Sequence, residues 1–164
     1  HFFDDGKKLI EYDPSFWFFK NPLCIDIPCD DGYLIQYKDV KNDLKDDTDL
    51  LLIRTGYEKF RTNRKYWERN PGLSANLGEG IRSKHKNIRA MGVDLISITS
   101  RLHRIEGRKA HRVFLGENYS SDPIVLIEDM SLLSYNSKFS EVVVLPLLID
   151  NADGAPCTII AKGV

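Results

Sequence analysis

The sequence has few cysteines, no long hydrophobic run and almost no net charge. Its three cysteines, Cys24, Cys29 and Cys157, form no C-x-x-C pair. Because Cys24 and Cys157 lie in apolar, strand-like segments, we expect them to be small buried hydrophobic residues, which argues against a disulfide framework and favours a reducing cytoplasm. No apolar run approaches the roughly 20 residues that a membrane span needs. The formal net charge of -1 gives no general attraction to nucleic acid or to an anionic membrane.

Two familiar functional motifs, a dinucleotide-binding loop and a covalent catalytic triad, are also missing. The pair Gly78-x-Gly80 lacks the third glycine of a dinucleotide-binding loop and does not directly follow a predicted strand. The chain has no Gly-x-Ser-x-Gly elbow, and no cysteine lies near a histidine in the sequence. The sequence therefore indicates neither a dinucleotide enzyme nor a covalent catalytic triad.

The composition that is present, with 42% hydrophobic and 29% charged residues in a chain of 164, is typical of a soluble protein of one domain. We expect residues 1–164 to form that domain. The first residue is His1, with no initiator methionine and no signal peptide. We therefore expect that residues upstream of it are missing, and that the domain lacks its N-terminal part.

Apolar strands alternate with helical patterns along the chain. The strands that we expect are Leu23–Ile27, Leu50–Arg54, Leu95–Thr99, Ile124–Ile127, Glu141–Ile149 and Cys157–Ala161. The helical segments that we expect are Lys38–Asp47, Glu79–Met91 and a helix from Gly107 that carries His111, preceded by a basic loop over Arg101–Arg108. This order predicts the α/β class, with flanking helices and a mixed sheet that is parallel in the middle and antiparallel at its margins.

Aromatic residues gather in two segments. The cluster Phe16–Phe19 is expected to pack against the core or against a partner, because four exposed aromatic residues in a row favour aggregation. In the basic segment Tyr57–Asn70, Tyr66 and Trp67 are the residues that we expect to be buried. Trp17 is a candidate for the wall of a substrate pocket, with simple core packing as the alternative.

The segment from Gly107 to Met130 contains the candidate site. His111 falls on the predicted helix, and Glu128 follows the predicted strand Ile124–Ile127. A histidine and a carboxylate on two neighbouring elements are the residue types that a hydrolytic metal site needs. The alternative is a surface histidine and a solvated strand end.

A basic cluster surrounds His111. It consists of Arg101, Arg104, Arg108, Lys109 and Arg112, around His103 and His111. The functional interpretation is an anion or carboxylate subsite, with Arg104 as a candidate substrate contact. The alternative is a solvated helix face.

Six short stretches together resemble the kynurenine formamidase-like family of metal-dependent hydrolases, which is also known as the cyclase family. They occur in order over nearly the whole chain: Leu52-Ile53-Arg54-Thr55-Gly56, Gly92-Val93-Asp94 leading to Ile98-Thr99-Ser100, Ala110-His111-Arg112, Ile127-Glu128-Asp129-Met130, Leu145-Pro146-Leu147 and Asp153-Gly154-Ala155-Pro156. The resemblance implies a swivelling β/β/α domain, a homodimer or higher homo-oligomer, and hydrolysis of the amide bond in a small arylformamide or cyclic amide with zinc or manganese.

The resemblance also assigns residues. The family's signature is H-x-G-T-H-x-D-x-P-x-H, and His1-Phe2-Phe3-x-x-Gly6 is similar to its last histidine and the residues after it. By resemblance, His1 is catalytic, and His111 and Glu128 are catalytic residues and metal ligands. The signature's two histidines and aspartate that hold the main metal have no counterpart in the sequence. The alternative to an enzyme is therefore a binding or assembly protein that keeps the fold without a complete metal site.

Overall fold

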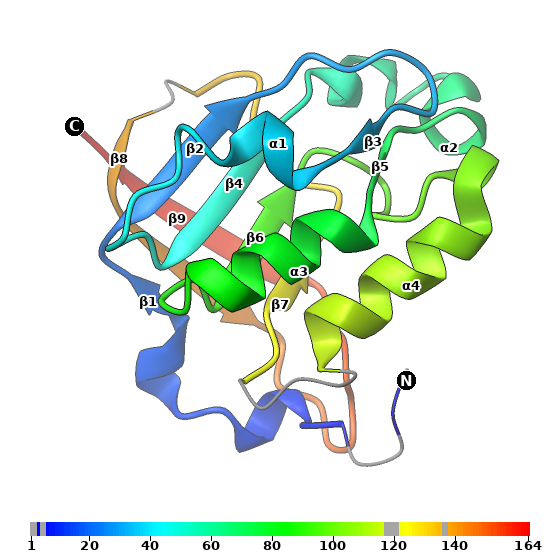
Figure 1. Ribbon diagram of the computed structural model, residues 1–164. Helices are drawn as coiled ribbons and strands as arrows, with labels where there is room; N and C mark the ends of the chain where they lie inside the picture. Colours follow the sequence, from blue (N-terminus) through cyan, green and yellow to red (C-terminus); the bar gives the residue numbers. More distant parts are fainter. Residues whose placement is uncertain (1–2, 4–5, 117–121, 136–137) are drawn as a thin grey trace.

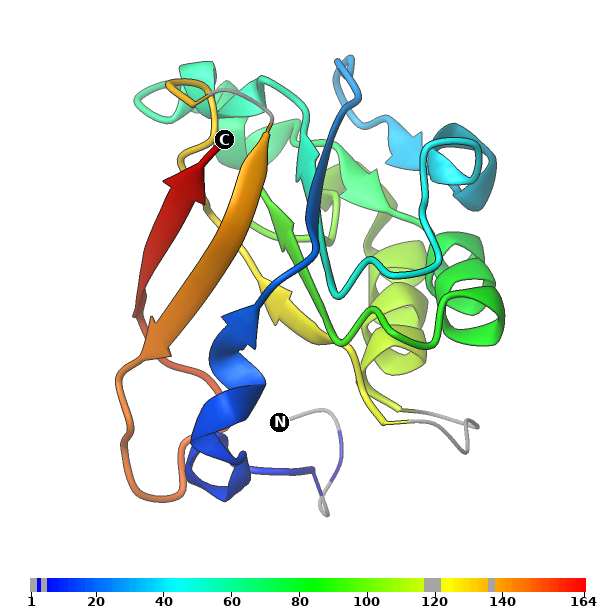
Figure 2. The same ribbon diagram turned by 90° about the vertical axis from the view of Figure 1, so that its left-hand side faces the viewer.

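The strands and helices form three layers, with a parallel sheet in the middle. The computed structural model describes residue 3 and residues 6–116, 122–135 and 138–164. Figure 2 shows an antiparallel sheet on one side of the parallel sheet and the long helices on the other. This β/β/α order confirms the predicted α/β class. The parallel and antiparallel strands, which we expected in one mixed sheet, lie in separate sheets that pack face to face.

The parallel sheet has the strand order β2-β4-β6-β7. Its strands are β2 (Pro22–Asp26), β4 (Leu50–Arg54), β6 (Ala90–Val93) and β7 (Val125–Ile127). Every neighbouring pair in it is parallel. The carboxyl ends of the four strands therefore lie along one edge, which is where ligand crevices open in α/β sheets.

The outer sheet contains β1 (Phe18–Phe19), β8 (Phe139–Pro146) and β9 (Cys157–Gly163), with β8 in the middle and both pairs antiparallel. Two further short strands, β3 (Leu34–Ile35) and β5 (Gly72–Leu73), pair in parallel beside the main sheet.

The helical layer is formed mainly by α3 (Ala75–Lys84) and α4 (Arg104–Leu115), which pack against each other (Figure 1). Shorter helices are α1 (Tyr37–Val40) and α2 (Lys65–Glu68), and 3-10 turns occur at η1 (Leu9–Glu11), η2 (Pro14–Trp17), η3 (Tyr57–Phe60) and η4 (Arg101–His103). None of the described helices is long and apolar enough to cross a membrane.

The parallel sheet separates two hydrophobic cores, and strand β4 contributes side chains to both. Alternate residues of a strand point to opposite faces. Leu51 and Ile53 therefore join the core under the helices, whereas Leu50 and Leu52 join the core shared with the antiparallel sheet. All four side chains are at most 2% exposed. The continuous apolar run in the sequence is thus confirmed as a strand that is covered on both faces.

Several predicted elements match closely. The helix that carries His111 and the strand before Glu128 are confirmed as α4 and β7. The predicted strands at Leu23, Leu50 and Cys157 correspond to β2, β4 and β9. The predicted strand Glu141–Ile149 is β8, which ends at Pro146, a residue without an N–H to continue the ladder.

The predicted helix Glu79–Met91 is wrong in its second half. Helix α3 begins after Ser74, whose hydroxyl accepts a hydrogen bond from the Leu77 amide at 3.2 Å, and it ends at Lys84. Met91 belongs to the buried strand β6. A strand of four residues is too short to show a period of its own, so apolar residues spaced by three suggested a longer helix.

Other local predictions also need correction. The predicted strand Leu95–Thr99 is an irregular segment, because its backbone groups bond to residues outside any ladder, such as the Leu95 carbonyl, which accepts from the Asp129 amide. The predicted basic loop is already helical from Arg104 onward. The predicted helix Lys38–Asp47 is reduced to the short α1. Aspartates in that segment favour turns over helix interiors.

Burial differs from prediction at three aromatic or cysteine positions. Tyr66 is buried as predicted, but its neighbour Trp67 is 41% exposed, because successive helical residues point in different directions. In the aromatic cluster, Trp17 and Phe19 are buried, whereas Phe18 is 47% exposed on the outer sheet. Cys157 is exposed on the edge strand β9 rather than buried.

Candidate active site

His111 and Glu128 face each other across the gap between α4 and β7. The His111 Nε2 atom lies 3.6 Å from the Glu128 Oε1 atom. The two side chains are 12% and 33% exposed, so the pair is partly shielded and still reachable from solvent. The two residues that the sequence singled out are therefore neighbours in space.

The other nitrogen of the His111 ring is held by the helix itself. Its Nδ1 atom lies 2.9 Å from the Gly107 carbonyl oxygen and 3.2 Å from the Thr99 hydroxyl. A carbonyl oxygen can only accept a hydrogen bond, so the bond assigns the proton of the neutral ring to Nδ1. The Nε2 lone pair of the neutral ring then points toward Glu128.

Gly107 allows this arrangement because it has no side chain. A Cβ atom built on Gly107 would lie 2.4 Å from the Thr99 side chain, which is closer than real Cβ contacts. The glycine thus lets α4 approach Thr99 closely, and one turn later His111 meets the same threonine. The sequence contains no signal for this contact between residues eight positions apart.

The Glu128 carboxylate is oriented by the segment after β6. Its Oε1 atom accepts hydrogen bonds from the Ile98 amide at 2.8 Å and from the Ser97 hydroxyl at 3.1 Å. Charge-assisted hydrogen bonds of this kind fix a carboxylate more firmly than neutral ones. Glu128 is therefore a fixed group at the carboxyl end of β7 and not a freely solvated strand end.

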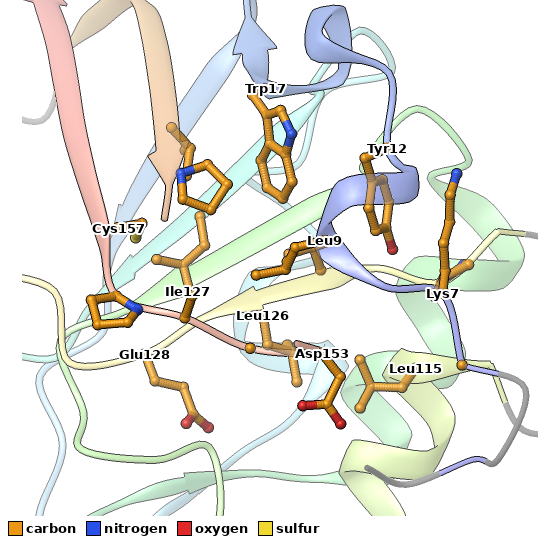
Figure 3. Close-up of a pocket in the computed structure, with 18 of the residues that line it drawn as sticks. Lys7, Leu9, Tyr12, Trp17, Leu115, Leu126, Ile127, Glu128, Asp153 and Cys157 are labelled. Atoms are coloured by element: carbon orange, nitrogen blue, oxygen red, sulfur yellow. The ribbon is translucent and has the colours of Figure 1, made fainter. Parts of the chain in front are cut away.

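A pocket of about 590 Å³ opens beside this pair. Apolar and aromatic side chains from both ends of the chain form much of its lining, among them Leu9, Tyr12, Trp17, Leu115, Leu126, Ile127, Val144 and Pro146. Figure 3 shows the rings of Trp17 and Tyr12 on one side and the carboxylates of Glu128 and Asp153 on the other. The pocket therefore combines an apolar wall with an acidic one.

The remaining candidate residues are placed as follows. Trp17 lines the pocket and is also buried in the core between the sheets. Arg104 is exposed at the start of α4 and does not line the pocket. His103 is exposed next to it. His1 lies outside the described residues.

Sequence reasoning missed other polar residues of the pocket. Lys7 and Asp153 line it from opposite ends of the chain. Asp153 belongs to one of the stretches that carry the family resemblance, but the resemblance gave it no role in the site, and Lys7 had no pattern of its own. Their place depends on how the N-terminal segment and the β8–β9 connection lie over β7, which local patterns do not encode.

The cysteines are unsuited to nucleophilic catalysis. Burial raises the pKa of Cys24 to about 11 and that of Cys29 to about 12. Cys157 lines the pocket, and partial desolvation there raises the pKa of its thiol as well. Because the thiolate is the reactive form, the raised pKa values keep the Cys24 and Cys29 thiols protonated at neutral pH and make them poor nucleophiles.

The described residues offer few candidate metal ligands at this site. Within the part of the chain that the structure describes, no group of three or more His, Cys, Asp or Glu side chains is arranged to hold a metal ion. His111 and Glu128 offer one imidazole nitrogen and one carboxylate.

The fold is similar to that of isatin hydrolase A from Labrenzia aggregata, solved with bound benzyl benzoate. The TM-score is 0.75 at 15% sequence identity, and the alignment covers 98% of this chain and 67% of that chain. No curated protein sequence matches the chain. A family model described as "Putative cyclase" matches residues 1–100, more than half of the sequence. This match shows that the chain belongs to the cyclase family.

Proposed function

We propose that the protein is a metal-dependent hydrolase that cleaves the C–N amide bond of a small arylformamide or cyclic amide. The family and the fold support an enzyme of the hydrolase or cyclase type. The observation that carries the proposal is the His111–Glu128 pair, with Nε2 and Oε1 3.6 Å apart beside a largely apolar pocket. Small-molecule sites commonly combine an apolar lining with a few fixed polar groups.

The donor chemistry of the pair fits zinc or manganese. Zinc binds imidazole nitrogen and carboxylate oxygen, and carboxylates also suit manganese. The bond between His111 Nδ1 and the Gly107 carbonyl is the outer contact that metal-binding histidines usually make. His111 Nε2 and the Glu128 carboxylate would be two of the ligands, and the bound ion would lower the pKa of its water to about 7 and polarise the substrate carbonyl.

His111 offers the same atom for two roles. Because Nδ1 is held by the Gly107 carbonyl, both metal binding and proton transfer would use Nε2. One histidine cannot do both at once. If Nε2 binds the ion, the proton that the leaving nitrogen requires has to come from another group, and His1 is our proposal for it.

The chain's own residues account for the rest of the reaction. Hydrolysis joins the oxygen of water to the carbonyl carbon, breaks the C–N bond and puts a proton on the leaving nitrogen. Glu128, fixed by Ile98 and Ser97, would hold its carboxylate toward the reacting water or ion. Trp17 and Tyr12 would hold an aromatic substrate ring against the opposite wall.

The aromatic wall supports a substrate with a ring. The pocket of about 590 Å³ lies within the usual range for small-molecule sites. The structural neighbour is named for isatin and was solved with benzyl benzoate. We therefore propose isatin and simple arylformamides as the first compounds to test.

The test uses protein expressed from the full reading frame. Metal content is measured by inductively coupled plasma mass spectrometry, and hydrolysis of isatin and of an arylformamide is followed by ultraviolet absorbance. We expect about one or two divalent ions per subunit and turnover of at least one compound. Protein without metal that hydrolyses neither compound would support the rival function, a binding or assembly protein.

A further inference from the structure

The residue after Glu128 has an unusual backbone conformation. Asp129 has a φ of 58°, in the left-handed region that residues other than glycine rarely adopt. Aspartate tolerates this region better than most residues, but other contacts have to hold it there. Because Asp129 directly follows Glu128, its conformation sets the direction in which the chain leaves β7.

Side chains from one short segment hold this turn from the outside. Arg61 donates from Nε to the Asp129 carboxylate at 3.1 Å, and from Nη2 to the carbonyl oxygens of Asp129 at 2.9 Å and Met130 at 3.1 Å. The Tyr66 hydroxyl donates to the same carboxylate. Glu58 accepts hydrogen bonds from the Ser131 hydroxyl and the Leu132 amide, further along the turn.

The inner side of the turn is bonded to the segment that orients Glu128. The Asp129 amide donates to the Leu95 carbonyl at 2.7 Å, and the Met130 amide donates to the Val93 carbonyl at 3.0 Å. Three residues after Leu95, the Ile98 amide donates to Glu128. The turn is therefore fixed between Arg61 and Tyr66 on one side and the end of β6 on the other.

We propose that Arg61 and Tyr66 are positioning residues, which hold Asp129 in its left-handed conformation and thereby keep the Glu128 carboxylate opposite His111. The effect on turnover rests on the proposed function of Glu128, whereas the effect on geometry does not. The hydrogen bonds described above join these two residues to Asp129 and Met130, so both act on Glu128 through the turn.

Tyr66 is the stronger anchor of the two. It is 2% exposed, and burial, followed by the Asp129 carboxylate, raises its pKa, so the hydroxyl stays protonated and remains a donor. Arg61 and Asp129 have side chains that are 38% and 53% exposed, and exposed ion pairs of this kind contribute little energy by themselves. The contribution of Arg61 therefore lies in its three directed hydrogen bonds.

The direct test is the amide resonance of Ile98 in a nitrogen–proton NMR spectrum. This amide donates to Glu128, so its chemical shift reports where the carboxylate lies. We expect Tyr66→Phe and Arg61→Met to move the resonance. The matched control is Arg64→Met, on the same segment, because the Arg64 side chain is 80% exposed and pairs only with Glu68 among the described residues. It should leave the resonance unchanged.

Kinetics provide the second readout. We expect Tyr66→Phe to lower kcat by about fivefold or more with KM nearly unchanged, and Arg64→Met to leave both unchanged. Asp129→Asn should keep the resonance and most of kcat, because asparagine tolerates the left-handed region and its carbonyl can accept from Tyr66. Alanine tolerates the left-handed region less well and has no side-chain acceptor for the Tyr66 hydroxyl. Asp129→Ala should therefore shift the Ile98 resonance and lower kcat.

The resonance and the kinetics test the positioning role separately from the proposed function of Glu128. An Ile98 resonance that stays at its wild-type position in both Tyr66→Phe and Arg61→Met overturns the positioning role, whatever the turnover. Loss of turnover without movement of the resonance overturns it as well. If Glu128→Gln retains full turnover, the proposed function of Glu128 fails, while the resonance still decides whether Arg61 and Tyr66 position its carboxylate.

Discussion

The guanidinium of Arg82, on α3, donates a hydrogen bond of 3.0 Å to the carbonyl oxygen of Phe114, in the last turn of α4. The same Nη1 atom donates to the Val113 carbonyl at 2.8 Å. Arg82 is 4% exposed, so a buried cation stabilises the negative end of the helix that carries His111. The two long helices of the helical layer, α3 and α4, are therefore joined by a polar contact as well as by packing.

Arg82→Met should destabilise the protein. The substitution leaves the buried Val113 carbonyl oxygen without this donor, at a cost of about 1–3 kcal/mol, whereas the Phe114 carbonyl oxygen still accepts from the Ile124 amide at 2.8 Å. We expect the free energy of unfolding, measured by urea denaturation, to fall by about 1–3 kcal/mol. Arg108→Met, the same change at an exposed position of α4, should stay within about 0.5 kcal/mol of wild type. Equal stability of the two variants would contradict the capping role.

His111→Ala should lower turnover of an arylformamide or cyclic amide by at least about tenfold, or about 1.4 kcal/mol of transition-state stabilisation. The reason is the loss of the Nε2 atom that faces Glu128. His103→Ala is the matched control, because His103 is exposed and does not line the pocket. Steady-state kinetics check the pair. If only His103→Ala lost activity, the active site would have to be assigned to the basic residues around Arg104 and not to His111.

Glu128→Gln should reduce turnover to a similar extent and should also weaken metal retention. A neutral amide is a poorer ligand than a carboxylate. The glutamine oxygen can still accept from the Ile98 amide, so the fold should be preserved. Metal per subunit after dialysis against a weak chelator is the measurement. Full metal content with lost turnover would mean that Glu128 acts on water rather than on the ion.

The protein should form a homodimer or higher homo-oligomer. Phe18, Val143 and Ile160 are aligned across the outer sheet by its register, and Phe18 and Ile160 are 47% and 59% exposed. A second copy of the chain could cover this apolar row. Light scattering at micromolar concentration should give at least twice the monomer mass. Ile160→Lys should reduce it, whereas Ile105→Lys, at a 76% exposed position on α4, should not. Monomer mass for wild type would contradict this prediction.

Lowering the pH should destabilise the folded protein, because His85 becomes protonated. Burial, followed by the nearby Lys84, lowers the pKa of His85, although Asp46 opposes this. Its Nε2 atom lies 3.0 Å from the Tyr37 hydroxyl, and no described residue bonds its buried Nδ1 atom. Protonation therefore favours the unfolded chain. The contribution of His85 is fully present above about pH 6.5 and is lost as the pH falls through the lowered folded-state pKa.

Urea denaturation at pH 7.5 and pH 5.5 checks the His85 prediction. Wild type should lose more stability between the two values than His85→Phe does, because phenylalanine has no proton to bind. His103→Phe, at an exposed position, should keep the wild-type difference. A wild-type difference that His85→Phe leaves unchanged would assign the pH dependence to other groups.

Local pattern alone determined most of the longer elements in this protein. The run Leu50–Arg54 is a strand covered on both faces, and α4 and β7 lie where the periodicity around His111 and before Glu128 indicated. Each of these follows from the spacing of apolar residues within a few turns or pleats, which the order of residues records directly. The nearness of His111 to Glu128 was also predictable, because consecutive elements usually pack as neighbours.

Tertiary structure alone decided how that pair is held. Arg61 and Tyr66 reach Asp129 across more than 60 positions of sequence, and Lys7 and Asp153 join one pocket from opposite ends of the chain. Strand β6 was hidden for a related reason, since four residues show no period and become a strand only between β4 and β7. Such contacts depend on how layers stack and loops cross, and stacking joins residues that no local spacing relates.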